Sequence, residues 1–381
     1  MKRISILLLV FAFLMSCDKK PDYITPVSPP EPPAPVIDEP EQPSEKAEYD
    51  FSVVEMPLEA SMVFTSGYML RYYSVMQSFA LCGDGYMYGI QVGTSQNKYL
   101  LNVTYKQVQS DSGKQYMQLP FAGHGGNMDL ERESDADYIW VGSYGTWNGT
   151  KYTNSQTVAR IRFKTGARYT PSQCSDQYYL PGFRNVSPAL DLANDRLLIW
   201  GLSNSESSTG YFKVFSLSEA KASPIVDMTL ERSITYGGGD SGIEEMTEKP
   251  SIKAHNLGAL TPLASIRLNG EALGTGANQG FALFGDYILH LNGGGNDSNP
   301  QLPSQSTLTV LNWSGDILGS YNVGAVSDKG PLASLGITDT GFMEAEGVKI
   351  YNDCLYLGYA TKHSADTKRM VTIFKYDIKK K

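Results

Sequence analysis

From about residue 51 the chain alternates short runs rich in Tyr, Phe, Val, Ile and Leu with clusters of Gly, Asn, Asp and Ser. The apolar runs are typical of β-strands and the polar clusters of turns. No amphipathic run of twelve residues or more favours a helix, and the best short candidate, residues 216–222, covers one or two turns. The pattern predicts an all-β domain over residues 51–381.

One local pattern occurs five times: a short strand, a turn with Asp, and a second strand of alternating apolar residues. The turn aspartates are Asp84, Asp137, Asp195, Asp286 and Asp353. Gly-Asp and Asn-Asp favour tight hairpins, because these residues adopt positive φ at little cost. Further apolar runs follow each hairpin, at 98–105, 156–163, 211–217, 307–313 with 316–321, and 370–378. Each unit is therefore expected to hold four strands.

Five units of four antiparallel strands predict a five-bladed β-propeller, in which radial stacking protects the sheet edges. The largest insertion falls between about residues 225 and 276. A six-bladed propeller is the alternative if this insertion contains a blade. The run 61–75 is expected to lie beside the strand at 370–378 and to close the ring.

The N-terminal residues have the pattern of a bacterial lipoprotein. Lys2 and Arg3 precede an apolar run, which ends in Leu14-Met15-Ser16-Cys17. The run is too short to span a bilayer, so residues 1–16 are interpreted as a signal peptide and Cys17 as the lipidated residue. Residues 17–50 hold nine of the twenty prolines and predict an extended, disordered tether. We expect an exported monomer, anchored through lipid alone to the bacterial envelope, at the outer membrane.

The net charge of −8 argues against a phosphate-binding surface of the kind that nucleic acids require. The only run of Lys is the C-terminal tip at 379–381. DNA and RNA are therefore excluded as expected partners.

In a propeller the first strand of each blade lies nearest the central axis, so polar residues at its start are expected to line the mouth of the channel. Gln77, Gln279 and Glu346 occupy the same repeat position. The expected ligand-binding residues are Gln77, His124, Asn127, Asp129, Gln156, Arg160, Ser187, Asp191, Gln279 and Glu346. The alternative is that these side chains satisfy one another and buried water along a narrow channel.

Acid and base candidates also lie in these segments. His124 is flanked by glycines, and Glu344 and Glu346 alternate on a predicted strand and so share one face. The candidate catalytic residues are His124, Glu344 and Glu346, for glycoside or ester chemistry. No Gly-x-Ser-x-Gly motif specifies a nucleophile. A solvated pair of carboxylates is the simpler alternative.

The sequence also offers candidates for a calcium site and for a disulfide. Asp240 and Asp297 lie in Gly-rich loops whose oxygens suit calcium, although loops without metal are favoured, and no cofactor is otherwise expected. The absence of Cys-x-x-Cys and His-x-x-x-His argues against structural zinc. Cys82 and Cys354 are expected in neighbouring blades, either as a disulfide or as buried small apolar residues.

Four short motifs, in this order, resemble the helveticin J-like and teichoic acid biosynthesis protein C-like propellers of bacteria. They are Gly-His-Gly at 123–125 with Asn127, residues 156–161, residues 278–282 with Asp286 and Tyr287, and residues 344–347. The resemblance covers most of residues 60–378 and implies an envelope-associated five-bladed propeller. Named members are linked to bacteriocin activity or wall polymer synthesis. The lipobox and tether differ from secreted Gram-positive members and favour a Bacteroides-type lipoprotein over a bacteriocin.

Three function classes follow. The first, which we favour over an enzyme, is a propeller that binds a glycan or wall polymer at its polar channel mouth, framed by Trp147, Tyr144 and Trp313. The second is a hydrolase or lyase that uses His124 with Glu344 or Glu346. The third is a scaffold for protein docking.

Overall fold

The computed structural model describes residues 49–55, 61–64, 75–83, 86–92, 101–107, 115–147, 152–153, 155–170, 173–174, 176–206, 209–236, 244, 246–268, 277–295, 304–326, 333–334, 338–362 and 370–381. The predicted signal peptide, Cys17 and the tether up to residue 48 lie outside these residues. Strand β1 (Tyr49–Asp50) pairs with β28 (Lys379–Lys380), so regular structure begins two residues before the predicted boundary. No helix among the described residues is long and apolar enough to cross a membrane.

The described strands form four four-stranded sheets, one six-stranded sheet and three two-stranded sheets. One four-stranded sheet contains β3 (Met76–Gly83), β4 (Tyr86–Val92), β5 (Leu101–Gln107) and β6 (Gln115–Gln118). Another contains β13 (Phe183–Asp191), β14 (Arg196–Ser203), β15 (Gly210–Ser216) and β20 (Ala264–Leu268). A third contains β21 (Ala277–Phe284), β22 (Tyr287–Gly294), β23 (Gln305–Asn312) and β24 (Ile317–Asn322). The fourth contains β25 (Met343–Tyr351), β26 (Cys354–Thr361), β27 (Met370–Asp377) and β2 (Ser61–Phe64).

The six-stranded sheet has the order β7 (Met128–Arg132), β8 (Asp137–Ser143), β11 (Thr157–Arg162), β12 (Asp176–Tyr179), β19 (Ser251–Asn256) and β16 (Ile225–Thr229). The two-stranded sheets are β1 with β28, β9 (Thr146–Trp147) with β10 (Tyr152–Thr153), and β17 (Ile234–Tyr236) with β18 (Met246–Glu248). The helices are α1 (Leu217–Ala222) and the short 3-10 helices η1 (Ser52–Glu55), η5 (Leu257–Ala259) and η6 (Gly324–Val326). α1 confirms the short helix expected at 216–222.

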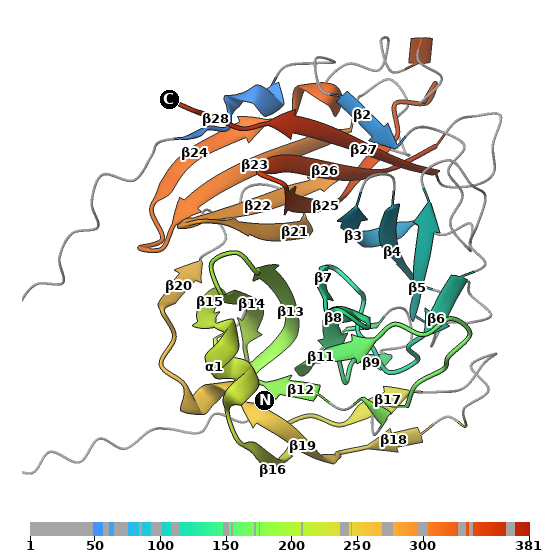
Figure 1. Ribbon diagram of the computed structural model, residues 1–381, viewed down its shortest axis with the longest axis vertical. Coiled ribbons are helices and arrows are strands. Elements are labelled where there is room, and N and C mark those ends of the chain that lie inside the picture. The colour runs from blue at the N-terminus through green and yellow to red at the C-terminus, as the bar shows by residue number, and fades with distance from the viewer. Residues whose placement is uncertain are drawn as a thin grey trace, which may run out of the picture. The chain divides into compact units, whose positions relative to one another are not determined.

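The sheets are arranged as a β-propeller, with β3, β7, β13, β21 and β25 packed one against the next around a common centre (Figure 1). The all-β class and the propeller arrangement are thus confirmed. Strand β2 pairs antiparallel with β27, which confirms the expected closure of the ring by an N-terminal strand. The six-bladed alternative is wrong for the described residues, because the insertion supplies β16 and β19 to the six-stranded sheet and β20 to the β13 sheet.

The inner strands β13, β21 and β25 turn back into their neighbours through turns that contain Asp195, Asp286 and Asp353, whereas Asp137 begins β8 and Asp84 lies outside the described residues. Tyr351 pairs with Cys354, so Asn352 and Asp353 form a two-residue turn, with φ angles of 48° and 57°. Asn and Asp tolerate this left-handed region better than most residues, which explains their presence there. We call this side of the propeller the turn end, and the side where the inner strands begin the mouth.

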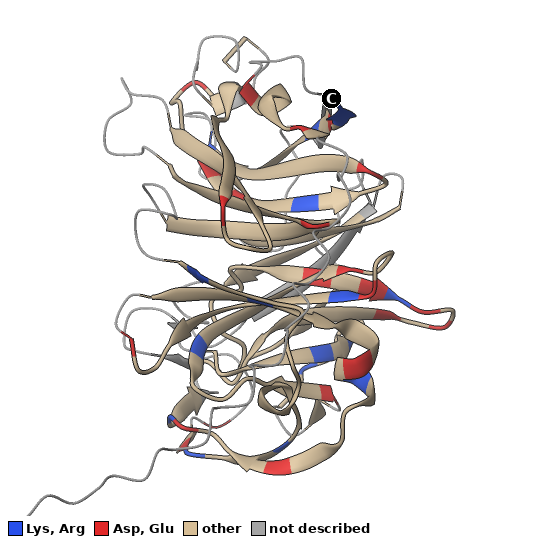
Figure 2. Cartoon of the chain, turned by 90° about the vertical axis from the view of Figure 1, so that its left-hand side faces the viewer, with Lys and Arg blue, Asp and Glu red and all other residues tan. Residues whose placement is uncertain are grey.

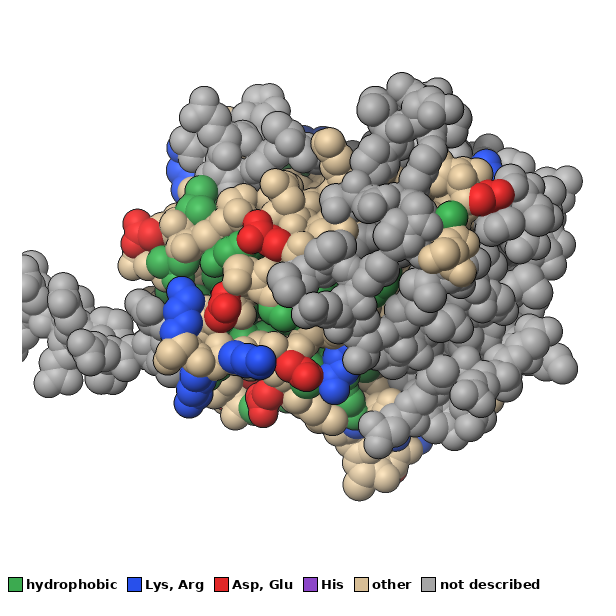
Figure 3. All heavy atoms as spheres, turned by 90° about the horizontal axis from the view of Figure 1, so that it is seen from above, with side chains coloured by type: hydrophobic (Ala, Val, Ile, Leu, Met, Phe, Trp, Pro, Cys, Tyr) green, Lys and Arg blue, Asp and Glu red, His purple; other side chains and the backbone are tan. Residues whose placement is uncertain are grey.

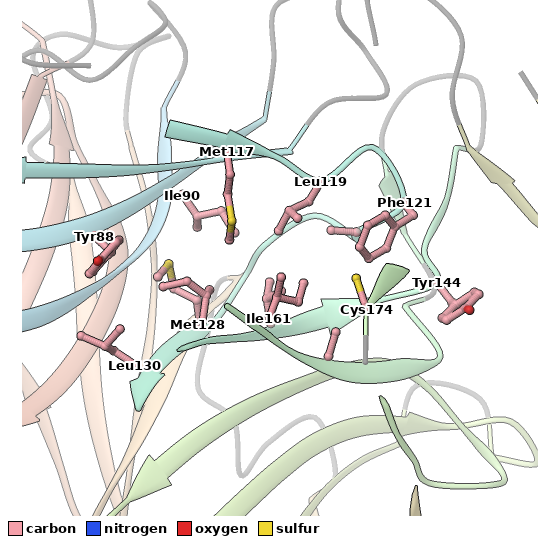
Figure 4. Close-up of a cluster of buried hydrophobic side chains, with 14 of the residues drawn as sticks. Tyr88, Ile90, Met117, Leu119, Phe121, Met128, Leu130, Tyr144, Ile161 and Cys174 are labelled. Carbon is pink, nitrogen blue, oxygen red and sulfur yellow. The ribbon is translucent and has the colours of Figure 1, made fainter. Parts of the chain in front are cut away.

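Apolar side chains fill the space between adjacent sheets. Figure 4 shows one such cluster, in which Met117, Met128 and Ile161 from the β3 and β7 sheets pack together with Phe121 from the connection after β6. Burying each large side chain contributes about 1.5 to 3 kcal/mol, so these interfaces supply the main stabilisation of the fold. Charged residues lie mostly at strand ends and in connections (Figure 2), and both signs are interspersed on the face seen in Figure 3.

Candidate functional site

The centre of the propeller is filled by two side chains, Lys349 of β25 and Asn127, which directly precedes β7; both are buried. The amide nitrogen of Asn127 donates to the carbonyls of Pro188 (2.7 Å) and Phe281 (3.1 Å). Its oxygen accepts from Lys349 Nζ at 3.0 Å. Asn127 therefore joins β13, β21 and β25 to the start of β7, and this corrects the expectation that it contacts a ligand.

Asp129, two residues further along and within β7, also links neighbouring inner strands. Its two oxygens accept from the backbone N–H groups of Leu130 and Leu190, both at 2.9 Å, and Lys349 Nζ lies 3.9 Å away. Burial lowers the pKa of Lys349, and the charge of Asp129 opposes this effect. Asp129 thus stabilises the buried Lys349 and the contact between β7 and β13. The expectation was instead that Asp129 faces the mouth and binds a ligand.

Above this plug, Gln77, Gln279 and Glu346 directly precede the points where β3, β21 and β25 touch. A Cβ atom on Gly280 would lie 3.0 Å from the Cα of Gly347. A Cβ on Gly347 would lie 3.1 Å from an aromatic carbon of β3. Because the strands approach so closely at these glycines, the three preceding polar residues lie at one level on the mouth side. Their expected convergence is consistent with this packing.

Glu346 is a carboxyl group of the mouth whose pKa is strongly shifted. It is buried, and this burial raises its pKa well above the ordinary value, with a further contribution from the charge of Glu344. Glu344 is only partly buried. Two carboxyl groups thus interact at the mouth, and the buried one holds its proton to higher pH. Such a group can donate as well as accept a hydrogen bond.

His124 is exposed in the segment that leads to β7. The neighbouring glycines are explained by packing, because a Cβ on Gly123 would lie 2.9 Å from the Cβ of Ser155, and one on Gly145 would lie 2.6 Å from the Cα of Gly123. Close backbone approach to a ligand is therefore not needed to account for Gly123. Ser187, the other expected residue here, is partly buried in β13.

Three further expected ligand residues have structural roles. Gln156 is buried, and its side-chain amide binds the backbone N–H and C=O of Arg232, both at 2.9 Å. Arg160 lies in an ion cluster within the β7 sheet. Asp191 lies at the turn end, where it accepts from the backbone and side-chain nitrogens of Asn194. Asp191 therefore does not lie at the mouth, and Arg160 faces carboxylates within its own sheet, whereas Gln156 lies at the mouth end of β11 and binds the backbone of Arg232 there.

The ion cluster around Arg160 was not found from the sequence. Glu131 accepts from Arg160 Nε and from Lys221 Nζ, both at 2.6 Å, and from Trp140 Nε1 at 3.0 Å; Arg160 also pairs with Asp176 at 3.1 Å. Burial raises the pKa of Glu131, but these hydrogen bonds outweigh burial and lower it overall. The charged run at 131–133 was the only sequence signal. The cluster fixes α1 to the β7 sheet.

A pocket of about 620 Å³ opens beside this cluster at the turn end. Its lining residues are Glu131, Arg132, Leu192, Asp195, Leu217, Ser218, Lys221 and Ala222. The charged groups in it already have partners: Arg132 pairs with Asp137, and Asp195 accepts from Ser216 and Ser218. The pocket therefore presents satisfied charges, and the mouth is the better candidate site.

The aromatic frame expected at the mouth is not formed as predicted. Tyr144 is buried in the apolar cluster of Figure 4. Trp313 follows β23 at the turn end, where the guanidinium of Arg196 lies 5.5 Å from its ring centre. Trp147 lies in β9, and its side chain is outside the described part of the structure.

The expected metal and disulfide sites have different outcomes. Asp240 and Asp297 lie outside the described residues, and within these residues no group of three or more His, Cys, Asp and Glu could hold a metal ion. Cys82 and Cys354 are both free thiols, so of the two alternatives the disulfide is wrong. Burial raises the pKa of Cys82 to about 12, as for a small apolar residue, whereas Cys354 donates to Asp377.

No family model matches the sequence, and no curated protein does either. The tail fiber of Staphylococcus aureus phage P68 is similar in structure, with a TM-score of 0.55 and 17% identity. The match covers 84% of this chain and 52% of the tail fiber, so this chain spans about half of that protein. At this identity the similarity shows a shared fold alone.

Two carbohydrate-active enzymes are more distantly similar. An exo-β-1,3-galactanase from Phanerochaete chrysosporium has a TM-score of 0.40 and 9% identity, over 83% of this chain and 64% of the enzyme. An α-L-arabinofuranosidase from Lactobacillus brevis has a TM-score of 0.40 and 7% identity, over 82% of this chain and 92% of the enzyme. Similarity of this degree does not bear on the activity of this chain.

Proposed function

We propose that the protein is a five-bladed propeller that binds a glycan or wall polymer at the mouth. The six-stranded sheet serves as the fifth blade, because β7, β8, β11 and β12 follow the same inner-to-outer order as the other four sheets. β7 also packs between β3 and β13, in the place of an inner strand. Strands β19 and β16 extend this blade outward.

The observation that supports binding at the mouth is the placement of Gln77, Gln279 and Glu346 above a closed axis. The plug of Lys349 and Asn127 blocks the axis below them, so a ligand is held at the mouth. Amide and protonated carboxyl groups both donate and accept hydrogen bonds, which matches the hydroxyl groups of a sugar. Gln279 Nε2 donates to the Gly293 carbonyl at 3.1 Å, which orients its amide.

Calorimetry of the purified chain with a panel of oligosaccharides tests this proposal. We expect Gln279→Ala to weaken binding about tenfold, as expected for the loss of one or two hydrogen bonds. Lys253→Ala, which removes an exposed residue paired with Asp227, is the control and should bind as the parent does. Equal affinities of the parent and Gln279→Ala for every bound sugar would contradict binding at the mouth.

A glycan hydrolase is the second candidate, because the raised pKa of Glu346 beside Glu344 suits a general acid paired with a second carboxylate. In this mechanism Glu346 protonates the leaving oxygen, and Glu344 acts as base or nucleophile. Release of reducing ends from any bound glycan distinguishes it from simple binding. If it holds, Glu346→Gln should retain binding but lose at least about 100-fold in rate.

We also propose that the chain is a lipoprotein of a Bacteroides-type outer membrane, acylated at Cys17 and related to the helveticin J-like propellers. The apolar run followed by Cys17 and the Pro-rich tether support this proposal. Metabolic labelling with a palmitate analogue should label the parent and not Cys17→Ser. Equal labelling of both would reject lipidation at Cys17.

A further inference from the structure

Two arginines that sequence reasoning did not single out lie on the mouth side, next to the start of β13. Arg184 is the second residue of this inner strand and is partly buried. Asn127 binds the carbonyls of both Pro188 and Phe281, so these two residues lie at one level. Arg184 precedes Pro188 by four residues, and Gln279 precedes Phe281 by two. Both therefore lie on the mouth side of the level at which Asn127 binds these two carbonyls.

Neutral groups hold the side chain of Arg184 and the backbone of Arg232 in place. Arg184 Nη1 donates to the Ser203 carbonyl, and Asn204 Oδ1 lies 3.4 Å away. The backbone of Arg232 is bound at both its N–H and its C=O by buried Gln156. Gln156, expected as a ligand residue, is thus a positioning residue for Arg232.

The segment that carries Arg232 is also fixed to the start of β13. The adjacent Glu231 accepts from the backbone N–H of Gly182 at 2.8 Å and from the side-chain amide of Asn204. Asn204 therefore touches both Arg184 and Glu231. The carboxylate of Glu231 is bound by neutral donors and does not form an ion pair with either arginine.

Arg184 and Arg232 carry like charges on two segments that Asn204 holds together, through its contacts with Arg184 and with Glu231. Burial lowers the pKa of Arg184, and the charge of Arg232 lowers it further, so the two groups are close enough to repel. Within the described part of the chain, no carboxylate forms an ion pair with Arg184 or Arg232. Arg160 and Arg267, in contrast, form ion pairs with Glu131 and Glu206. Two neighbouring arginines with no ion pair to any described carboxylate are unusual in a chain of net charge −8.

We propose that Arg184 and Arg232 bind an oxyanion, the carboxylate or phosphate group of an acidic glycan held at the mouth. This proposal rests on the proposed glycan-binding function and narrows the ligand to acidic polymers. Guanidinium groups bind carboxylate and phosphate through paired N–H donors, and an anion between the two arginines removes their repulsion. Because the backbones are fixed in advance, little ordering is needed on binding.

An array that pairs each acidic oligosaccharide with its neutral form tests the proposal. Uronic acid oligomers are compared with their methyl esters, and phosphate-bearing oligomers with their dephosphorylated forms, so the two anion sources are distinguished. Affinities of hits are then measured with the full chain at about 50 mM and 300 mM salt. We expect the acidic form to bind at least about tenfold more tightly at the lower salt.

Arg184→Gln and Arg232→Gln should each reduce this preference to about threefold or less, because one charged donor is lost. Arg267→Gln is the matched control, since it removes the same charge from an exposed pair with Glu206. The thermal midpoint of Arg232→Gln should equal or exceed that of the parent, because a repulsion is removed. A lower midpoint, with unchanged preference, would show a structural role and overturn the proposal.

The remaining outcomes separate this proposal from the proposed function. Equal binding of acidic and neutral forms to the parent would overturn the anion site and leave glycan binding intact. If no saccharide binds, inorganic phosphate is the probe: a phosphate-dependent rise in thermal midpoint, lost in Arg184→Gln, would support the anion site while glycan binding fails. No saccharide binding and no effect of phosphate would overturn both.

Discussion

Lys349 Nζ donates a 3.0 Å hydrogen bond to Asn127 Oδ1 across 222 positions of sequence, and both side chains are buried. This contact joins β25 to the segment before β7 at the axis of the propeller. A buried ammonium is costly unless it is paired, and here Asn127 and Asp129 supply the partners. The pair therefore closes the axis and sets the floor of the mouth.

Asn127→Ala should destabilise the protein by on the order of 3 kcal/mol or more, because three buried hydrogen bonds are lost and Lys349 loses its acceptor. Asn194→Ala, an exposed asparagine in a turn, is the control and should cost about 1 kcal/mol or less. Denaturant unfolding measures both. Costs of equal size would contradict a special role for Asn127.

Gly280→Ala should destabilise the protein by about 1 to 3 kcal/mol, because its φ is 139° and the added Cβ would meet the Gly347 backbone at 3.0 Å. Gly294→Ala is the matched control, since nothing lies within 4 Å of its added Cβ. Thermal melts of the two variants compare them under the same conditions. If both melt as the parent does, the inner strands are not as closely packed as described.

The stability of the protein should depend on the ionisation of Glu346. Its folded pKa is raised, so the stability that it contributes is fully present below the ordinary value of 4.5 and is lost as pH rises through the raised value. Glu346→Gln removes this loss. The variant should match the parent near pH 4 and exceed it near pH 8, by about 1.4 kcal/mol for each unit of the shift. Parallel stability curves from pH 4 to pH 8 would be inconsistent with a buried carboxylic acid.

Glu131→Ala should cost about 3 kcal/mol, because Arg160, Lys221 and Trp140 would all lose a buried acceptor. Lys253→Ala, from an exposed ion pair, should cost less than about 0.5 kcal/mol. Urea unfolding of the two variants gives the comparison. A small effect of Glu131→Ala would mean that α1 is held to the β7 sheet by apolar packing alone.

The repeat pattern predicts the hairpins because the turn at Asn352 and Asp353 has a local cause, positive φ in a two-residue loop. It predicts the β2–β27 pairing because a ring must close. The interiors of the sheets follow from apolar alternation, which is also local. The hairpins and strand interiors can therefore be predicted from neighbouring residues, and the β2–β27 pairing from the closure of the ring.

The axial network could not be predicted in the same way, because Lys349 and Asn127 meet only after the ring has closed. One signal was present: counted from the turn, Lys349 stands at the third strand pair, where three of the other inner strands have Ala80, Ala189 and Ala282 and β7 has Leu130. A lysine among these alanines marks a special position. The roles of Gln156 and Arg160 depend on the direction of their side chains, which the motif at 156–161 does not give.

The most direct test of the account is hydrogen–deuterium exchange of the full chain with and without a bound oligosaccharide from the panel. Binding at the mouth should slow exchange at the starts of β3, β21 and β25, around Gln77, Gln279 and Glu346, and leave the turn end around Asp195 unchanged. Protection confined to the turn-end pocket, with the mouth unchanged, would contradict it.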